Sequence, residues 1–310
     1  MNKIANRQVI CDTLMELAKN DKDIMVIACD SRGSASMGNF ANEYPEQFVE
    51  VGIAEQNAVG IAAGLATCGK KPYVVSPASF ISMRSAEQVK VDVAYSNTNV
   101  KLIGISGGVS YGALGMTHHS LQDIAVMRAI PNLSIIFPAD RFETKKMIEA
   151  LNKYEGPVYI RIGRNAVEDI YEDENFIFEI GKGNEIKSGN DITIIATGET
   201  VKPALDASKL LNKDGIGCRV INMHTIKPLD REIIIKAAKE TKGIITIEEH
   251  SIFGGLGAAV SEVVSQEAPT KMRILGIKDE APITGNSKEV FNYYGLTADN
   301  LVKEAKIIIG

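Results

Sequence analysis

The sequence predicts an α/β fold built from two doubly wound domains, and three observations lead to this prediction. Short apolar runs of strand length alternate with longer amphipathic stretches along most of the 310 residues. The short runs are rich in Val and Ile and show no polar alternation, which is typical of parallel strands covered on both faces. The alternation stops between residues 168 and 190 and then resumes, so the chain divides into two units.

In the first unit, residues 1–167, strand and helix patterns follow one another regularly. The expected strands are 25–30, 48–52, 72–77, 100–106, 133–137 and 158–162. The expected helices are 3–19, 54–68, 84–96, 120–129 and 141–154. Strand, helix and strand in this order predict a parallel sheet with right-handed crossovers.

The second unit, residues 191–310, repeats the same pattern after a connection. Residues 168–190 are expected to be this linker, because they carry several acids, few helix signals and three glycines. The expected strands are 192–197, 218–223, 243–247 and 272–277. The expected helices are 201–213, 230–241, 255–266 and 297–306.

Composition and charge exclude several classes of protein. Hydrophobic residues make up 45% and charged residues 24% of the chain, unlike a disordered or fibrous protein. The net charge of −5 leaves no basic footprint for nucleic acid or for an anionic membrane. No run approaches the roughly 18 apolar residues that cross a bilayer, and the N-terminus lacks a secretory pattern. The four cysteines are widely spaced, which is typical of a reducing compartment. We therefore expect a soluble cytoplasmic protein.

Open α/β sheets bind ligands beyond the carboxyl ends of their strands, so the residues that follow each strand are the candidates for a site. Glu55 follows strand 48–52, although a glutamate at a helix start also has a structural explanation through the helix dipole. Residues 107–119 contain four glycines and end in His118 and His119. Such a loop is costly in backbone entropy, which favours a pocket-shaping role. Zinc is not expected, because no further His or Cys lies at ligand spacing.

For three further segments, a purely structural role explains the residues as well as a role in ligand binding does, or better. Arg161 and Arg164 end strand 158–162 and could form a fork for phosphate or carboxylate, or could be surface charges. Phe80 follows strand 72–77, and core packing explains it at least as well as a ligand contact. The glycines of 254–257 favour a close strand–helix turn over a phosphate loop.

Taken together, these segments resemble the C-terminal half of transketolase. The matching stretches run in the same order along nearly the whole chain: Val-Gly-Ile-Ala-Glu-Gln-Asn (51–57), Gly-Met-Thr-His (115–118), Asp-Ile-Ala-Val-Met-Arg-Ala-Ile-Pro-Asn (123–132), Pro-Ala-Asp (138–140), Thr-Ile-Lys-Pro-Leu-Asp (225–230), and Glu-Glu-His (248–250) with Gly-Gly-Leu-Gly (254–257). The resemblance implies a pyrimidine-binding domain, 1–167, and a transketolase C-terminal domain, 191–310, of a split enzyme.

The resemblance further implies thiamine diphosphate as the cofactor and the transfer of a two-carbon ketol unit from a ketose phosphate to an aldose. Glu55 falls on the glutamate that hydrogen-bonds N1′ of the cofactor's pyrimidine in the family. Phe80 falls on the aromatic residue that stacks on this ring. Asp30 falls on a position that lines the cofactor.

For the substrate, the resemblance implies contacts from four residues. His118 falls on a histidine that contacts the donor ketose and assists proton movement, and His119 beside it is expected to bind substrate too. Arg164 falls on an arginine that binds the sugar phosphate. Ser34 falls on a position at the phosphate end of the channel.

Two positions depart from the family pattern. Leu114 stands where the family often carries an aspartate that grips a substrate hydroxyl. Ser106 stands near the place of a second family histidine. The resemblance therefore implies that part of the donor-reading machinery has changed, unless His119 or Ser110 supplies the missing contact.

One half of the family's cofactor site is missing from the sequence. The family holds the pyrophosphate through Mg²⁺ or Ca²⁺ with a Gly-Asp-Gly motif, which does not occur in these 310 residues. The resemblance thus implies that an N-terminal, pyrophosphate-binding partner subunit carries the metal ligands, and that two copies of each chain form a heterotetramer.

Three alternative functions remain open on the sequence. A relative of deoxyxylulose-phosphate synthase shares the same domain pair, as does the β subunit of a 2-oxoacid dehydrogenase. Thr117-His118 and the run 123–132 favour transketolase over the dehydrogenase subunit. The third alternative is a non-catalytic α/β scaffold, against which Glu55 and His118 argue.

Overall fold

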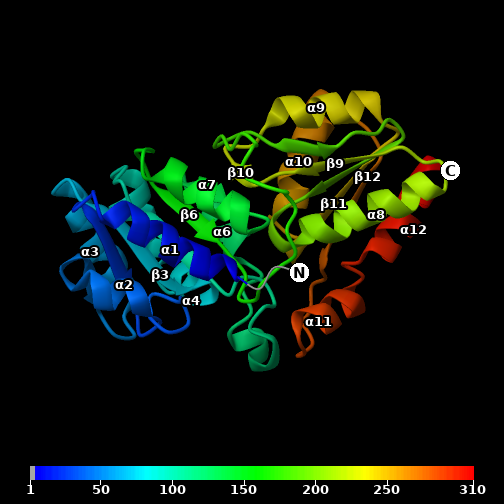
Figure 1. Ribbon diagram of the computed structural model, residues 1–310. Coiled ribbons are helices and arrows are strands. Elements are labelled where there is room, and N and C mark those ends of the chain that lie inside the picture. The colour runs from blue at the N-terminus through cyan, green and yellow to red at the C-terminus, as the bar shows by residue number, and fades with distance from the viewer. Residues whose placement is uncertain (1–3) are drawn as a thin grey trace.

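The computed structural model describes residues 4–310, which form two α/β domains that lie side by side (Figure 1). Within these residues the first sheet has the spatial order β10 (Thr225–Lys227), β5 (Ser134–Ile136), β6 (Val158–Arg161), β4 (Lys101–Ile105), β3 (Lys71–Pro77), β1 (Ile24–Ala28) and β2 (Phe48–Glu50). The second sheet has the order β12 (Met272–Ile277), β11 (Ile244–Ser251), β8 (Ile192–Ala196), β9 (Cys218–Asn222) and β7 (Asn184–Lys187). The predicted α/β class with two sheets is confirmed.

Each sheet is parallel except at one edge, where the structure adds a strand that the sequence did not predict. β7 lies inside the range predicted as a linker and pairs antiparallel with β9. β10 follows the second domain's β9, yet it pairs antiparallel with β5 of the first sheet. Both strands are short, so their side-chain alternation is too brief to stand out in a sequence.

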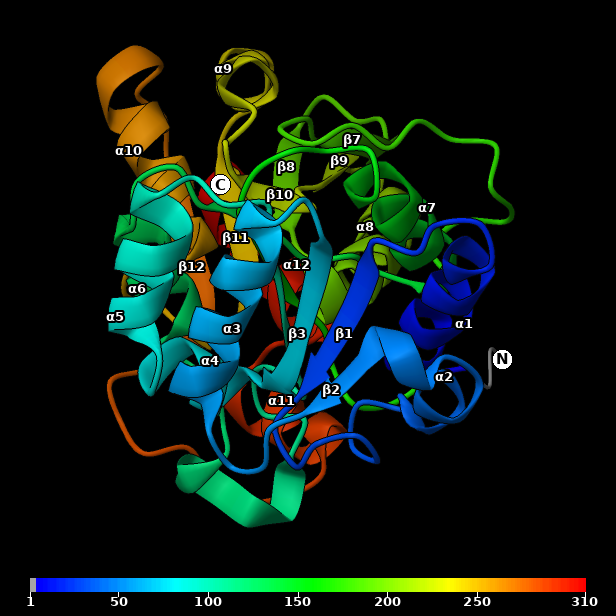
Figure 2. The ribbon, with the colours of Figure 1, turned by 90° about the vertical axis from the view of Figure 1, so that its left-hand side faces the viewer.

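Helices cover both faces of the first sheet, as Figure 2 shows. One face carries α3 (Glu55–Thr67), α4 (Ala78–Met83), α5 (Ala86–Gln88), a π-helix (Val89–Tyr95) and α6 (Asp123–Ala129). The other face carries α1 (Asn6–Ala18), α2 (Gly38–Glu43) and α7 (Arg141–Leu151). The start of the helix expected over 3–19 lies outside the described residues.

The helix expected over 84–96 begins at Ala86 as α5 and continues without a gap as the π-helix that ends at Tyr95, and a separate short helix, α4, precedes it. The hydroxyl of Ser82 donates to the carbonyl of Ala78 at 2.6 Å, and that of Ser85 donates to the carbonyl of Ile81 at 2.5 Å. Such bonds to the preceding turn compete with the helix ladder and bend it. The bend explains why α4 ends at Met83 and a new segment begins at Ala86.

The second domain is also covered on both sides. α8 (Val201–Lys213) and α12 (Ala298–Ile309) pack on one face, and α9 (Arg231–Glu240) and α10 (Leu256–Glu267) on the other (Figure 1). The unpredicted α11 (Ser287–Tyr294) has clear start and stop signals in hindsight. Asn286 and Glu289 form a capping box, and Gly295 ends the helix in the left-handed region.

One apolar core runs across both domains. It joins Ile27 and Val74 of the first sheet to Ile195 and Ile221 of the second, together with the inner faces of α9 and α10. A second core lies between the first sheet and α1 with α7, and a third between the second sheet and α8 with α12. The shared core holds the two sheets in a fixed relation.

A buried ion cluster completes the joint between the domains. Arg161, at the end of β6, is 7% exposed. Its Nε lies 3.5 Å from Oδ2 of Asp123, and its Nη2 donates to the backbone carbonyl of Glu249 at 2.5 Å. The backbone N–H of Val109 crosses in the other direction and donates to Oε1 of Glu249 at 2.7 Å. Polar groups of the first domain therefore have their hydrogen-bond and charge partners in the second domain, and the reverse is also true.

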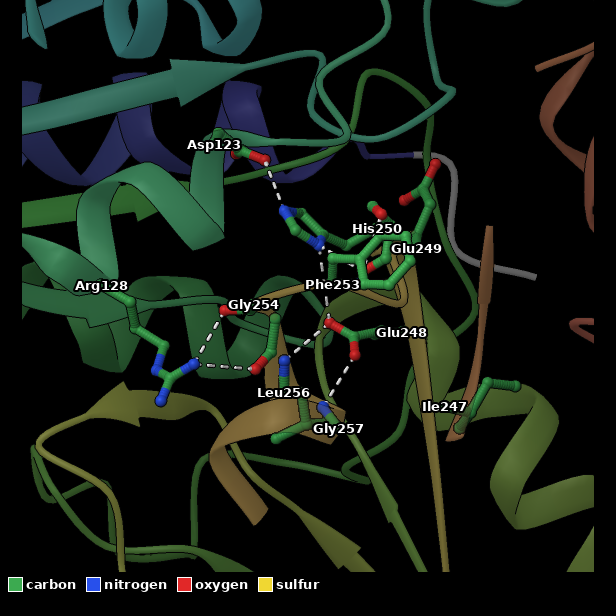
Figure 3. Close-up of polar contacts among 12 residues, drawn as sticks. Asp123, Arg128, Ile247, Glu248, Glu249, His250, Phe253, Gly254, Leu256 and Gly257 are labelled. Atoms are coloured by element: carbon green, nitrogen blue, oxygen red, sulfur yellow. Dashed lines mark hydrogen bonds and ion pairs between the residues drawn. The ribbon is translucent and has the colours of Figure 1, made fainter. Parts of the chain in front are cut away.

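Glu248, the neighbour of Glu249 on β11, points to the start of α10 (Figure 3). It accepts hydrogen bonds from the backbone N–H groups of Leu256 and Gly257, both at 2.7 Å. A Cβ at Gly255 would collide with Oε2 of Glu248, so only glycine fits there. The glycine cluster is a close strand–helix turn, as predicted, and the carboxylate of Glu248 occupies the helix terminus where an anion would bind.

The cluster around Arg161 contains more carboxyl groups than cations. Glu199, Glu249 and Asp123 all act on the one guanidinium. Burial, and then the charge of Glu199, raise the pKa of Glu249 to about 8. Burial also raises the pKa of Glu199, against the attraction of Arg161. This pair therefore retains a proton near neutral pH.

We expect the chain to lose stability as the pH rises through about 8. A carboxyl whose pKa is raised in the folded state keeps its proton at pH values where the unfolded chain has already released it. Its contribution to the free energy of unfolding is therefore complete below the ordinary glutamate pKa and is lost above the folded pKa. The amide in Glu249→Gln stays neutral and keeps an oxygen that accepts from the N–H of Val109. The loss of unfolding free energy between pH 5.5 and 8.5 should therefore be smaller in this variant by more than about 1 kcal/mol. Urea unfolding at about pH 5.5, 7 and 8.5 measures the slope.

Glu232→Gln is the matched control, because the side chain of Glu232 is 88% exposed. Its pH slope should equal that of the wild type. An unchanged slope in Glu249→Gln would show that the proton is not held at this joint.

Candidate active site at the carboxyl edge of the first sheet

Glu55 is a buried carboxylate at the carboxyl edge of the first sheet. It is the first residue of α3, directly after the turn at Gly52 that ends β2, and it is 4% exposed. Ser76, near the end of β3, donates to its Oε1 at 3.2 Å. Arg84 donates to its Oε2 at 3.1 Å from a side chain that is 47% exposed. Both oxygens are thus held, one by a fixed hydroxyl and one by a movable cation.

A run of ring contacts connects Glu55 to His118. The guanidinium of Arg84 lies over the ring of Phe80, 4.1 Å from its centre. The edge of Phe80 meets the ring of His118 with the centres 5.2 Å apart. Oγ1 of Thr117 lies 2.9 Å from Nδ1 of His118. The structure therefore brings together Glu55, Phe80 and His118, which come from three separate segments of the chain.

A cavity of about 300 Å³ lies between α4 and the loop that carries the histidines. Phe80, Arg84, Thr117 and His119 are among its lining residues. The Nε2 of His119 lies 3.2 Å from the carbonyl oxygen of Gly112, whereas its buried Nδ1 has no partner among the described residues. Burial lowers the pKa of His119, so this imidazole is neutral at pH 7.

Two arginines lie at the far end of the same run of contacts. The guanidinium of Arg164 is 5.0 Å from the ring centre of Tyr111, which in turn meets His118 edge-on. Nη1 of Arg7 donates to the carbonyl of Ser34 at 2.5 Å. Burial, and then the charge of Arg164, lower the pKa of Arg7. Two neighbouring guanidinium groups are suited to an anion.

Arg7 is the site residue that sequence reasoning missed. It lies in the first turn of α1, 27 positions from Ser34, so no local pattern connects it to the edge of the sheet. Its Nε and the Nη1 of Arg164 are buried and have no hydrogen-bond partner within residues 4–310.

Arg161 and Arg164, for which a fork and surface charges were both open on the sequence, do not form a fork. Arg161 turns into the joint between the domains, where Asp123 and Glu249 surround it. Arg164 alone reaches the edge that carries Tyr111. Asp30 lies at the end of β1 with an exposed side chain, and its backbone N–H donates to Oε1 of Glu50 at 2.7 Å.

The two positions that depart from the family pattern both precede the histidines in the chain. Leu114 is 52% exposed in the short 3₁₀ segment η3 (Gly112–Thr117). Ser106 is fully buried with φ +54°, and its hydroxyl has no partner among residues 4–310. The hydroxyl of Ser110 already donates to the carbonyl of Gly107 at 2.6 Å.

Residues 4–310 contain no group of three or more His, Cys, Asp and Glu side chains that could hold a metal ion. No helix in this part of the chain is long and apolar enough to cross a membrane.

A buried carboxylate, an aromatic face and paired arginines at the carboxyl edge of a parallel sheet define an α/β ligand-binding domain joined to a second α/β domain. The profile of the transketolase pyrimidine-binding domain matches residues 2–169, and that of the transketolase C-terminal domain matches residues 181–301. The chain belongs to the transketolase family.

Relatives of similar length support the same assignment. One subunit of an apulose-4-phosphate transketolase from Phocaeicola vulgatus is 55% identical over 98% of this chain and 97% of its own. A putative transketolase C-terminal section from Methanocaldococcus jannaschii is 44% identical over 94% of this chain and 92% of its own. A solved split-gene transketolase, described as an inactive β4 tetramer, has a TM-score of 0.89 at 36% identity and covers 99% of both chains.

Proposed function

We propose that this chain is the subunit of a split, thiamine-diphosphate-dependent transketolase that holds the cofactor's pyrimidine and the donor sugar. The enzyme moves a two-carbon ketol unit from a ketose phosphate to an aldose. The observation that supports this proposal is the unbroken run of contacts from buried Glu55 through Phe80 to His118. These contacts link Glu55, where the cofactor is expected to bind, to His118, where the sugar is expected to bind.

The side chains at the edge fit an aminopyrimidine ring. Glu55 offers a carboxyl to ring nitrogen N1′, and Ser76 holds its other oxygen in place. Phe80 offers a ring face that the half-exposed Arg84 covers in this structure, so Arg84 has to move for the pyrimidine to stack there. When bound, thiamine diphosphate supplies an electron sink for a carbanion. Asp30, exposed just after β1, is proposed as a further contact of the cofactor.

The remaining residues bind and orient the sugar. Thr117 engages Nδ1 of His118, so Nε2 is the atom that exchanges protons with donor hydroxyls. Arg164 and Arg7 bind the phosphate as paired cations, beside Ser34. His119, neutral and buried with a free Nδ1, provides one further polar contact.

A partner subunit completes the site. The metal that holds the pyrophosphate, Mg²⁺ or Ca²⁺, has its ligands on that partner, in keeping with the missing Gly-Asp-Gly motif. Large apolar side chains are exposed beside Glu55, Ile53 at 73% and Met83 at 56%. We infer a cytoplasmic heterotetramer in which this surface is covered. The solved relative described as a β4 tetramer is inactive, which supports the need for a second chain.

Glu55→Gln should leave the fold intact and reduce turnover of the assembled enzyme by at least about 100-fold, because cofactor activation depends on a carboxyl at this position. Steady-state ketol transfer measures the loss, and far-UV circular dichroism checks the fold. Glu46→Gln, on the exposed surface before β2, is the control and should be active. Near wild-type turnover in Glu55→Ala would contradict the assignment.

The chain by itself should be inactive. Isothermal titration calorimetry with thiamine diphosphate and Mg²⁺ or Ca²⁺ should give no metal-dependent binding at micromolar concentration, since the metal ligands are on another chain. Adding a partner of about 250–300 residues that carries Gly-Asp-Gly should restore binding and activity. Metal-dependent binding by the isolated chain would overturn the split-enzyme proposal.

The preferred donor should differ from xylulose 5-phosphate. Leu114 cannot accept a hydrogen bond, and Ser110 is buried and is not among the residues that line the cavity beside the histidines, so neither replaces the missing aspartate. His119 lines that cavity, but its neutral imidazole does not carry the charge of an aspartate. The 55% identical relative is named for apulose 4-phosphate, which makes this compound the first alternative donor to test.

The measurement is kcat/KM for a panel of ketose phosphates with the assembled enzyme. Leu114→Asp should shift the preference toward xylulose 5-phosphate. If the wild type uses xylulose 5-phosphate at about 10⁴ M⁻¹s⁻¹ or better and no other donor exceeds it, the donor prediction is wrong.

A further inference from the structure

The two neighbouring histidines depend on two glycines for their positions. The backbone N–H groups of His118 and His119 both donate to the carbonyl oxygen of Gly115, each at 2.9 Å. The imidazole of His119 contacts the carbonyl oxygen of Gly112 at 3.2 Å. Gly115 has φ +67° and ψ −157°, a conformation that is essentially restricted to glycine. Any shift of these two peptide units moves both imidazoles.

A loop of the C-terminal domain covers these same two glycines. A Cβ at Gly112 would lie 2.9 Å from the carbonyl oxygen of Gly285, and one at Gly115 would lie 2.8 Å from Cγ2 of Thr284. Figures 1 and 2 both show η3 beside the segment that leads into α11, at the lower edge of the molecule. The close approach leaves no room for a side chain at either position.

The covering loop, residues 283–286, is itself held at both ends. The N–H of Ile283 donates to the hydroxyl of Tyr294 at 3.2 Å. Asn286 and Glu289 exchange the two bonds of a capping box at 3.0 and 3.1 Å. Val290, in the next turn of α11, is fully buried in the core of the C-terminal domain. Hydrogen bonds therefore anchor the loop to the C-terminal domain at both of its ends.

The first domain holds the base of the histidine loop, whereas the C-terminal domain lies against its tip. An antiparallel bridge between Gly108 and Ser120 closes the base of the histidine loop. At its tip, however, Leu114 is 52% and Met116 is 49% exposed. These two side chains of the tip are about half-exposed, while Thr284 and Gly285 lie close to its glycines.

We propose that residues 283–286 of the C-terminal domain are a positioning element for the donor-binding histidines, with Thr284 as its main contact. The proposal rests on the proposed function for the role of His118. It gives the C-terminal domain a direct part in the reaction, although none of its side chains needs to touch the substrate. Thr284 acts on Gly115, and Gly115 acts on both histidines.

The test compares Thr284→Gly, which removes the Cγ2 contact, with Thr284→Val, which keeps a methyl group in that place and loses only the hydroxyl. Thr284 is exposed, so both variants should fold. Amide hydrogen exchange of the His118 and His119 N–H groups, measured on the chain alone, reports the positioning directly. We expect about tenfold faster exchange in Thr284→Gly and wild-type exchange in Thr284→Val.

The assembled enzyme provides the second readout. In Thr284→Gly, kcat/KM for the donor should fall at least about threefold, because small misplacements of contacting groups are costly. The Kd for thiamine diphosphate should change less than kcat/KM does, since Glu55 is held by Ser76 and Arg84 and not by the histidine loop. A general loss of structure would change both quantities together.

Unchanged amide exchange in Thr284→Gly would overturn the proposal, as would faster exchange with an unchanged kcat/KM. An equal effect of Thr284→Val would overturn the assignment to the methyl contact. If the wild-type enzyme transfers no ketol unit, the proposed function fails, and the exchange comparison alone then decides whether the loop positions the histidines.

Discussion

The buried guanidinium of Arg161 is the interaction on which the rest of this structure depends. Removing a charge from water is costly unless partners compensate, and here Asp123 comes from the first domain while Glu199 and Glu249 come from the second. The cluster therefore forms only when the two domains are docked in one arrangement. That arrangement also brings the loop before α11 against the histidine loop. The same docking of the domains thus forms the ion cluster and places the C-terminal loop beside the proposed substrate site.

Charge is distributed differently at the joint and at the site. At the joint, carboxyl groups outnumber cations, and burial raises the pKa of Glu249 to about 8, so protons balance the excess. At the candidate site, Arg7 and Arg164 lie close together, and each has a buried nitrogen without a partner among residues 4–310. In the proposed function an anionic sugar balances these cations. Only three positions separate Arg161 from Arg164, yet Arg161 is enclosed in the joint between the domains and Arg164 is not.

Local patterns in the sequence were enough to predict the two α/β units and most of their strands, because buried parallel strands are apolar throughout. They were also enough to point to Glu55 and to the loop that ends in His118 and His119, because strand ends and glycine-rich loops are visible in a sequence. Short edge strands such as β10, and the division of the helix near Ser82 and Ser85, follow from pairing and hydroxyl bonds that leave little pattern.

The sequence by itself thus determined the fold class, the family resemblance and the positions of the main candidate residues. Only the tertiary structure decided which residues meet: Arg7 with Ser34, Arg161 with Glu249, and Thr284 with Gly115. The physical reason is that periodicity and turn chemistry act over a few residues, whereas these contacts join segments far apart in the chain. Their partners are selected by the docking of whole elements and domains.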